Sequence, residues 1–348
     1  MASPQTQERP QNLRSLTDDE LDRVIFHLNQ PAFRSKQVRQ WIWEKNVTDF
    51  DQMTNIPSSL RQELAHGYTL TMPVEVARQQ SADGSRKYLL AMADGVRVEC
   101  VGMPSKGHLS VCVSTQAGCG MGCAFCATGK LGLTRSLEGH EIYDQVTHVA
   151  RDFDMRVGSV VFMGQGEPFA NYDATLFALR RLNNPNCAGI GARHLTVSTC
   201  GVLPGIAKFA GEPEQFTLAV SLHSAIQRTR DALMPGAKRW SLAHLHSSMA
   251  EYAQRTGRRP TYEFALIGGV NDTDDELQAL CEFCAGTLCH VNLINLNEVE
   301  GSKFVPSRPG RDQEFINALT QVGVEATIRT SRGGDIDAAC GQLHLRTK

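Results

Sequence analysis

The sequence has no long apolar run and no excess of charge of either sign. Apolar residues make up 41% of its 348 residues, yet no stretch approaches the ~18 residues that suggest a membrane span. The N-terminal stretch MASPQTQERPQN lacks the basic-then-apolar layout of a signal peptide. We therefore expect residues 1–15 to be a disordered tail and the protein to be cytoplasmic. With 35 Lys and Arg against 37 Asp and Glu, overall charge predicts no nucleic-acid partner, so an RNA binder would need local basic patches.

The cysteine pattern lacks the second pair of ligands that zinc sites usually have. Eleven cysteines are present, but the chain is long and has no secretory signal, which argues against a disulfide scaffold. Cys119, Cys123 and Cys126 lie close together in the glycine-rich stretch AGCGMGCAFCATGK. A rival group of ligands comprises Cys281, Cys284, Cys289 and His290. This rival group lies where a helix runs into a strand, so we expect ordinary buried cysteines there.

Three thiolates in one glycine-rich loop suit an iron–sulfur cube better than zinc. Such clusters normally have one Cys ligand per iron. Three cysteines would hold three irons and leave the fourth open to a cofactor or substrate. The spacing C-x3-C-x2-C, with Phe125 before the last cysteine, therefore predicts a reactive cluster held by Cys119, Cys123 and Cys126.

The chain divides into three predicted parts after its tail. Residues 16–70 indicate a small helical domain, which begins with a capping-box pattern at Thr17 and Glu20. A basic helix face interleaved with Trp41 and Trp43 also suits contact with an RNA backbone, although a solvated helix face is the more common explanation of such a pattern. Residues 71–108 predict a β-hairpin extension, because Asp94-Gly95 lies between two apolar runs.

Residues 109–345 predict an α/β barrel or partial barrel. Short apolar strands such as SVVFMG, HLTVST and FTLAVSL alternate with helical stretches, which is typical of parallel β-α units. In such barrels the chemistry gathers at the carboxyl ends of the strands. Turn residues explain the glycines at these ends. They do not explain why cysteines, a Glu and a His should all face the same mouth, as Cys119, Glu167 and His223 are expected to do.

Several motifs resemble known families. The three-cysteine loop resembles the radical S-adenosylmethionine (SAM) superfamily, and MGQGEP at 163–168 resembles the GGEP strand of that superfamily. SLHSAIQRTRDALMP, RTSRGGDIDAACGQL and the extra Cys112 resemble the RlmN/Cfr family of RNA adenine methyltransferases. This resemblance extends from about Leu16 to Leu345. It implies a radical SAM partial (β/α)6 TIM-like barrel whose C-terminal loop carries a methyl-bearing cysteine.

The resemblance also implies roles for individual residues. Cys119, Cys123 and Cys126 would hold a [4Fe-4S] cluster, and Cys340 would be the cysteine that is methylated. Cys112 would resolve the protein–RNA intermediate through a transient disulfide with Cys340, and Glu99 would be the proton acceptor. The SAM-contacting positions implied in this way are Gly166, Glu167, Ser198, Ser221, Leu222, His223 and Asn297.

These residue types suit methylation of an electron-poor carbon. Adenine C2 lies between two ring nitrogens and is electron-poor, so it cannot act as the nucleophile that ordinary methyl transfer from SAM requires. A thiolate is a strong nucleophile and can take a methyl group from one SAM. The resemblance implies that a radical formed from a second SAM then activates the S-methyl group of Cys340 for addition to the base. The adduct would be released by proton removal and by attack of Cys112.

The implied substrate is an adenine in 23S ribosomal RNA, with tRNA as a second candidate. An external electron donor of the flavodoxin type is expected, and we expect a monomer with no membrane partner. Gly334 stands where the C2-modifying branch commonly has an acidic residue. Methylation at C8, as in the antibiotic-resistance branch, therefore stays an alternative. An alternative of another class is a non-catalytic iron–sulfur or zinc RNA-binding protein.

Overall fold

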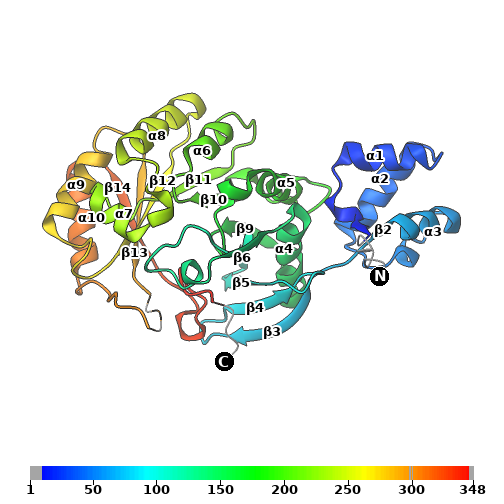
Figure 1. The fold of residues 1–348 in the computed structure, drawn as a ribbon, viewed down its shortest axis with the longest axis horizontal. Helices are drawn as coiled ribbons and strands as arrows, with labels where there is room; N and C mark the ends of the chain where they lie inside the picture. Colours follow the sequence, from blue (N-terminus) through cyan, green and yellow to red (C-terminus); the bar gives the residue numbers. More distant parts are fainter. Residues whose placement is uncertain (1–9, 298, 300, 345–348) are drawn as a thin grey trace, which may run out of the picture.

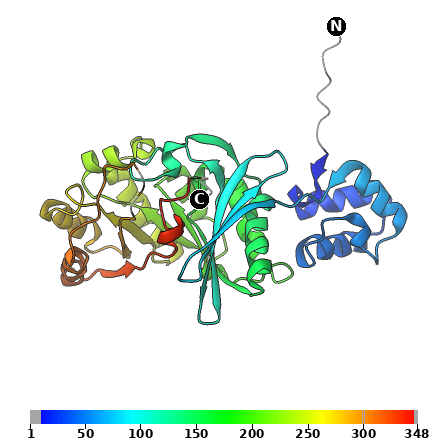
Figure 2. The same ribbon diagram turned by 90° about the horizontal axis from the view of Figure 1, so that it is seen from below.

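The computed structural model describes residues 10–297, 299 and 301–344. The N-terminal part is a small helical domain that lies to one side of a larger α/β domain (Figures 1 and 2). Its elements are β1 (Gln11–Asn12), α1 (Asp18–His27), α2 (Phe33–Arg39), α3 (Ser58–Gly67) and β2 (Tyr68–Thr69). The predicted capping box is present, because Thr17 accepts from the Glu20 backbone N–H and Glu20 accepts from the backbone N–H of Thr17.

Two expectations about this domain need correction. Residues 11–15 form β1 and a 3-10 turn in which Leu13 and Arg14 are fully buried, so this part of the expected tail belongs to the folded domain. The remainder of the expected tail, residues 1–9, lies outside the described residues. Trp43 is also buried, against Tyr143 and the Arg14 guanidinium, so it is not part of a surface that faces RNA.

A ten-stranded sheet forms the centre of the larger domain. Its strand order is β14-β13-β12-β11-β10-β9-β6-β5-β4-β3. The strands from β6 to β14 in this order pair in parallel, and they are β6 (His108–Cys112), β9 (Val157–Phe162), β10 (Leu195–Thr199), β11 (Thr217–Ser221), β12 (Thr261–Leu266), β13 (His290–Asn295) and β14 (Glu325–Arg329). The predicted strands of the partial barrel are therefore confirmed.

Helices cover the outer face of the parallel strands (Figure 1). They are α4 (Gly139–Phe153), α5 (Tyr172–Asn183), α6 (Leu203–Phe209), α7 (Gln227–Leu233), α8 (Leu242–Thr256), α9 (Asp274–Cys284) and α10 (Arg311–Gln321). Helix α4 shows why these segments are helical: Ile142, Val146 and Val149 recur at helical spacing and are all buried. Every helix in the described part of the chain is too short or too polar to cross a membrane.

An antiparallel extension continues the same sheet. Strands β3 (Val74–Gln80), β4 (Arg86–Ala91) and β5 (Arg97–Ser105) pair with one another, and β5 pairs with β6. The hairpin predicted at Asp94-Gly95 is therefore confirmed as β4–β5, whereas β3 was not expected. The β3–β4 turn holds the C-terminal loop, because Ser81 donates to Asp335 at 2.6 Å and the Gly333 N–H donates to Asp83 at 3.1 Å. Figure 2 shows this red loop beside the cyan strands.

Buried charges join the helical domain to the barrel. The Arg14 guanidinium bonds the Asp144 carboxylate of α4, and both side chains are completely buried. Arg181 of α5 bonds Asp18 of α1 at 2.6 Å and lies over the Trp43 ring. These contacts fix the helical domain against α4 and α5.

Candidate active site

Two adjoining cavities lie at the carboxyl ends of the parallel strands. The first cavity is lined by Cys119, Cys123, Cys126, Gly166, Glu167, Ser198, Ser221, His223, Glu263, Asn297 and Cys340, among others. The second cavity is lined by His108, Ser110, Cys112, Arg332, Ala338 and Leu343, among others. The wall between them is formed by residues that line both, which are Cys126, Thr128, Met163, Gly164, Ile294, Arg329, Cys340 and Gly341.

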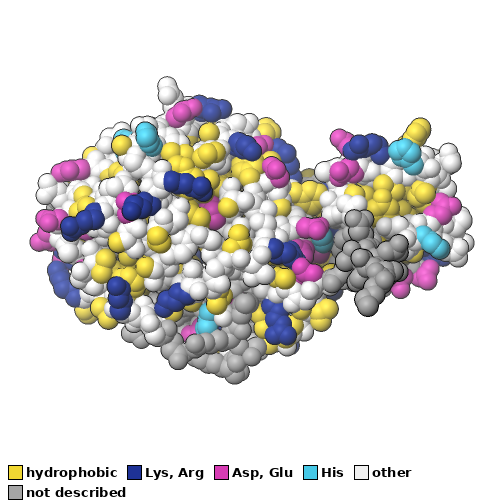
Figure 3. All heavy atoms as spheres, viewed as in Figure 1, with side chains coloured by type: hydrophobic (Ala, Val, Ile, Leu, Met, Phe, Trp, Pro, Cys, Tyr) yellow, Lys and Arg dark blue, Asp and Glu magenta, His cyan; other side chains and the backbone are white. Residues whose placement is uncertain are grey.

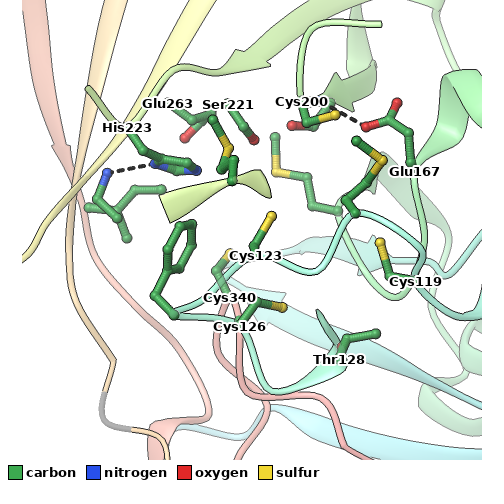
Figure 4. Close-up of a pocket in the computed structure, with 18 of the residues that line it drawn as sticks. Cys119, Cys123, Cys126, Thr128, Glu167, Cys200, Ser221, His223, Glu263 and Cys340 are labelled. Carbon is green, nitrogen blue, oxygen red and sulfur yellow. Dashed lines mark hydrogen bonds between the residues drawn. The ribbon is translucent and has the colours of Figure 1, made fainter. Parts of the chain in front are cut away.

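The three clustered cysteines lie in the loop between β7 (Gln116–Gly118) and β8 (Leu133–Ser136). Figure 4 shows them along one side of the first cavity. A turn folds the loop back on itself at Gly129, where an added Cβ would lie 2.8 Å from the backbone of Cys123, so a larger residue does not fit. Burial raises the pKa of the Cys119 thiol to about 11. A bound metal would supply the positive charge that favours the thiolates.

The Gly-Glu-Pro segment follows β9, as the sequence predicted. Gly166 has φ +104°, and an added Cβ would lie 2.7 Å from the Gln116 backbone nitrogen, so this position requires glycine. The Glu167 carboxylate is buried in the first cavity. Its two oxygens accept from the backbone N–H groups of Phe169 at 2.9 Å and of Cys200 at 2.8 Å. Burial raises the pKa of Glu167. The side chain thus fixes two neighbouring loops as well as facing the cavity.

The predicted residues of β10 and β11 also reach the first cavity, with one exception. Ser198, Ser221 and His223 line it, whereas the Leu222 side chain is fully buried outside it. Leu222 contributes through its backbone, because its N–H donates to the Glu263 carbonyl at 3.0 Å. His223 has φ +54° and its Nδ1 accepts from the Ala265 N–H at 3.0 Å, which fixes the ring beside the cavity.

The His223 environment predicts acid sensitivity of the fold. Burial and the nearby Arg230 charge lower the pKa of His223 from 6.5 to about 3. The unfolded chain therefore takes up a proton below pH 6.5 that the folded chain does not. We expect protonation of the unfolded chain at this site to lower the unfolding free energy by roughly 1 kcal/mol per pH unit as the pH falls below 6.5. Urea unfolding of apoprotein at several pH values measures it.

A substitution isolates this effect. His223→Asn keeps a residue that tolerates positive φ and removes the titrating ring, so its stability should fall less steeply with decreasing pH. The same change at the exposed His66 is the control. An unchanged slope in His223→Asn would contradict the assignment.

A tight turn presents Cys340 at the wall between the cavities. Cys340 and Gly341 occupy the central positions of a β-turn closed by the Gln342 N–H and the Ala339 carbonyl at 3.1 Å, with Gly341 at φ +83°. The Asn297 amide donates to the Cys340 carbonyl at 3.2 Å, and the Ala127 N–H donates to the Gly341 carbonyl at 2.7 Å. The Cys340 residue is exposed. The predicted Asn297 and Cys340 therefore lie together, next to the cysteine loop.

Cys112 and Glu99 lie outside the first cavity. Cys112 lines the second cavity, and burial raises the pKa of its thiol to about 12. Cys112 pairs with Val101 across β6 and β5, so Glu99, two residues before Val101, shares its face of the sheet. Glu99 lines neither cavity. It is 1% exposed and forms an ion pair with Lys87 at 3.3 Å.

Two charged residues of the site were missed by sequence reasoning. Glu263 of β12 lines the first cavity, and Arg329 at the end of β14 lines both cavities. A Glu within the apolar strand TYEFALI and an Arg directly before the C-terminal loop were the available signals. Their meeting depends on the closure of the sheet, which the sequence does not display.

Two family models and several known proteins match this chain. Residues 11–69 match the family model described as "Ribosomal RNA large subunit methyltransferase N-terminal domain", and residues 113–284 match the radical SAM superfamily. The chain is 43% identical to a Geobacillus kaustophilus protein named "Probable dual-specificity RNA methyltransferase RlmN", over 99% of this chain and 95% of that protein. A Staphylococcus aureus protein of the same name is 42% identical over 97% of this chain and 94% of its own length. The chain belongs to the RlmN family of radical SAM methyltransferases.

A solved structure agrees with this assignment. The crystal structure of a radical SAM methyltransferase from Sphaerobacter thermophilus superposes with a TM-score of 0.91 at 40% identity, covering 97% of this chain and 100% of that one. The cofactors of this RlmN-family chain are accordingly a [4Fe-4S] cluster and SAM. The first cavity fits them, since it combines three cysteines on one loop with a buried Glu and a row of polar strand ends. The rival ligands Cys281, Cys284, Cys289 and His290 line neither cavity.

Proposed function

We propose that this protein methylates C2 of an adenine in 23S ribosomal RNA and in tRNA, with Cys340 as the carrier of the methyl group. The observation that supports the proposal best is the position of Cys340. Its thiol belongs to the wall shared by the first cavity, which has the three clustered cysteines, and the second cavity, which has Cys112. The names of the Geobacillus and Staphylococcus relatives support a dual RNA substrate.

In this proposal the first cavity is the cofactor site. Cys119, Cys123 and Cys126 hold the cluster, and Gly166, Glu167, Ser198, Ser221, Leu222, His223 and Asn297 hold SAM. When bound, the cluster and SAM supply an electron, a methyl group and a carbon radical. Asn297 has a second task, because its bond to the Cys340 carbonyl positions the carrier residue beside the cofactor.

The second cavity receives the target base. Arg329, Arg332 and His108 line it, and none of its described lining residues is acidic, which suits a nucleotide. An adenine in this cavity would lie between Cys340 and Cys112. This position would allow Cys112 to resolve the protein–RNA adduct. The Cys112 thiol would attack the Cys340 sulfur and release the methylated base as a disulfide forms. To enter the cavity, the target base would leave its stack, as bases commonly do in enzymes that act on a single base.

Glu99 is proposed as the proton acceptor on the face that it shares with Cys112. The Lys87 ammonium lies 3.3 Å from this carboxylate and fixes its position. Because Glu99 lines neither cavity, the pair must open toward the second cavity when RNA binds.

The remaining assignments follow from the same proposal. The helical domain, residues 16–70 together with the folded residues 11–15, binds RNA, and residues 71–108 form the extension that holds the Cys340 loop. Residues 109–345 are proposed to form the catalytic barrel, and of these residues 298, 300 and 345 lie outside the described part of the chain. Figure 3 shows Lys and Arg side chains scattered over one face of the barrel, where RNA phosphates would meet them. We propose a cytoplasmic monomer that receives electrons from a flavodoxin-type donor.

Nucleoside analysis tests the proposed activity. Protein reconstituted anaerobically should hold one four-iron cluster and, with SAM and reductant, should methylate 23S ribosomal RNA and tRNA. Mass spectrometry of the digested RNA against 2-methyladenosine and 8-methyladenosine standards should show the C2 product. Cys119→Ala should lose both cluster and product, while Cys281→Ala should keep both.

Two outcomes would contradict the proposal. A C8 product would favour the antibiotic-resistance branch. Cluster-loaded protein that forms no methyladenosine would favour a non-catalytic iron–sulfur RNA-binding protein.

A further inference from the structure

A pair of cysteines outside the first and second cavities lies on one short turn. Cys284 is the last residue of α9, and Cys289 directly precedes β13. Residues 285–288 connect them, and three of these four residues are exposed. Cys284 is fully buried and Cys289 is 6% exposed. Both cysteines therefore lie directly beneath a surface turn, on the side of the barrel away from the helical domain (Figure 1).

The turn brings the two cysteines into contact. The Thr287 N–H donates to the Cys284 carbonyl at 3.1 Å, and this bond closes the turn. The Thr287 hydroxyl lies 2.7 Å from the same carbonyl oxygen and 3.3 Å from Cys289 Sγ. Cys289 Sγ in turn lies 4.0 Å from the Cys284 carbonyl oxygen, and the two thiols share a hydrogen bond. The fold therefore places two thiols side by side.

This contact makes the two thiols chemically unequal. The hydrogen bond from the Cys284 thiol lowers the pKa of Cys289, although burial opposes the shift, and the Thr287 hydroxyl and the Arg259 charge add to the lowering. The same hydrogen bond, together with burial, raises the pKa of Cys284. The thiolate is the form of cysteine that attacks other molecules and that peroxides oxidise. Cys289 is therefore the nucleophile of the pair, with the Cys284 thiol as its neighbour.

A third cavity reaches the same turn from below. It is lined by Thr287 and Leu288 of the turn and by His246 and Tyr262, among others. Tyr262 is the second residue of β12 and Leu288 comes shortly before β13, so this cavity lies near the amino ends of the strands, whereas the first and second cavities lie at the carboxyl ends. Because the Thr287 hydroxyl contacts Cys289 Sγ, a small neutral oxidant in the third cavity would approach Cys289 without entering the active site.

We propose that hydrogen peroxide oxidises Cys289 and Cys284 to a reversible disulfide. The Cys289 thiolate attacks one peroxide oxygen, the O–O bond breaks and hydroxide leaves, which gives a sulfenic acid on Cys289. The Cys284 sulfur then attacks the Cys289 sulfur, and the sulfenic oxygen leaves as water with the proton of the Cys284 thiol. The hydroxide takes up the proton that the Cys289 thiol had released. In total, two thiols lose two hydrogens and one peroxide becomes two waters. This modification site is independent of the proposed disulfide between Cys112 and Cys340.

Peptide mapping tests the proposal in the full-length, cluster-loaded protein. The protein is treated anaerobically with an equimolar amount of hydrogen peroxide in the presence of an iron chelator, labelled with N-ethylmaleimide and cleaved after Glu. Cleavage after Glu282 and Glu298 releases the peptide 283–298, whose only cysteines are Cys284 and Cys289. This peptide should lose two hydrogens and carry no label. Its oxidation should be about tenfold faster than that of Cys187, whose pKa burial raises, and dithiothreitol should restore both labels.

Two substitutions separate the roles of the cysteines. Cys284→Ser keeps a hydroxyl donor beside Cys289 but has no second sulfur, so the reaction should stop at a sulfenic acid on Cys289, which dimedone traps. Cys281→Ser is the matched control on α9 and should form the disulfide like the protein without substitutions. The proposal is overturned if the peptide 283–298 keeps both labels while other cysteines are oxidised, a result that does not depend on the folding of any variant. It is equally overturned if the disulfide joins Cys281 to Cys284 and leaves Cys289 labelled.

Discussion

Cys340→Ala should abolish RNA methylation while leaving the cluster and cofactor binding intact. Among the described residues, Cys340 and Cys126 are the only cysteines that line both cavities, and Cys126 is the one proposed to bind the cluster. In the proposed mechanism the methyl group then has no carrier, and we expect product formation to fall by more than about 10³-fold. The measurement is methyladenosine formed per cluster, together with the visible absorption of the cluster and the affinity for S-adenosylhomocysteine.

The matched control for this substitution is Cys187→Ala. Cys187 is also partly exposed but lines neither cavity, so its loss should leave methylation within about twofold. The protein mass supplies a second readout, since the protein without the substitution should carry one extra CH2 group on its Cys340 peptide. Methylation that persists in Cys340→Ala would rule out a carrier role for this thiol.

Asp144→Ala should be among the most destabilising single substitutions in this protein. It removes one partner of the fully buried ion pair between the helical domain and α4, and leaves the Arg14 guanidinium buried without its counterion. Loss of one partner of such a pair costs about 3 to 5 kcal/mol of unfolding free energy. Denaturant unfolding of the apoprotein, followed by tryptophan fluorescence, measures the loss directly because Trp43 packs on Arg14.

Two further variants separate burial from charge. Asp22→Ala breaks the half-exposed pair with Arg39 and should cost less than about 1 kcal/mol. The double variant Arg14→Met/Asp144→Leu replaces the buried pair by apolar groups and should recover most of the stability. If Asp144→Ala costs no more than Asp22→Ala, the buried pair does not anchor the domain.

Local sequence patterns predicted most of the fold because they are set by nearby residues. The parallel strands are apolar runs, the α4 face repeats at helical spacing, and Asp94-Gly95 marks the β4–β5 turn. Strand β3 was missed because its alternating pattern of Val, Glu, Ala and Gln carries no strong apolar signal. Leu13 and Arg14 were missed because their burial depends on contacts with residues far along the chain.

The candidate site was predictable where a motif carries it and unpredictable where it depends on closure of the barrel. The cysteine loop, Gly166, Glu167 and Cys340 come from short motifs and meet at the first cavity. The approach of Arg329 to Cys112 and Cys340 requires the last strand and the first strand to face a common space. No local sequence pattern indicates that these two distant strands approach each other.

The anchored turn at Cys340 limits how its sulfur can move. The carbonyl groups of Cys340 and Gly341 are both bound to other parts of the barrel, and a hydrogen bond from the Gln342 N–H to the Ala339 carbonyl closes the turn. The backbone is thus held on either side of the thiol, and one torsion, χ1, remains soft. If Cys340 carries the methyl group as proposed, its sulfur would move between the two cavities by a change of rotamer and not by movement of the loop. Such jumps take picoseconds to nanoseconds at exposed positions, whereas enzymes typically turn over about 1 to 10³ times per second. This change of rotamer is therefore not expected to limit the rate of catalysis.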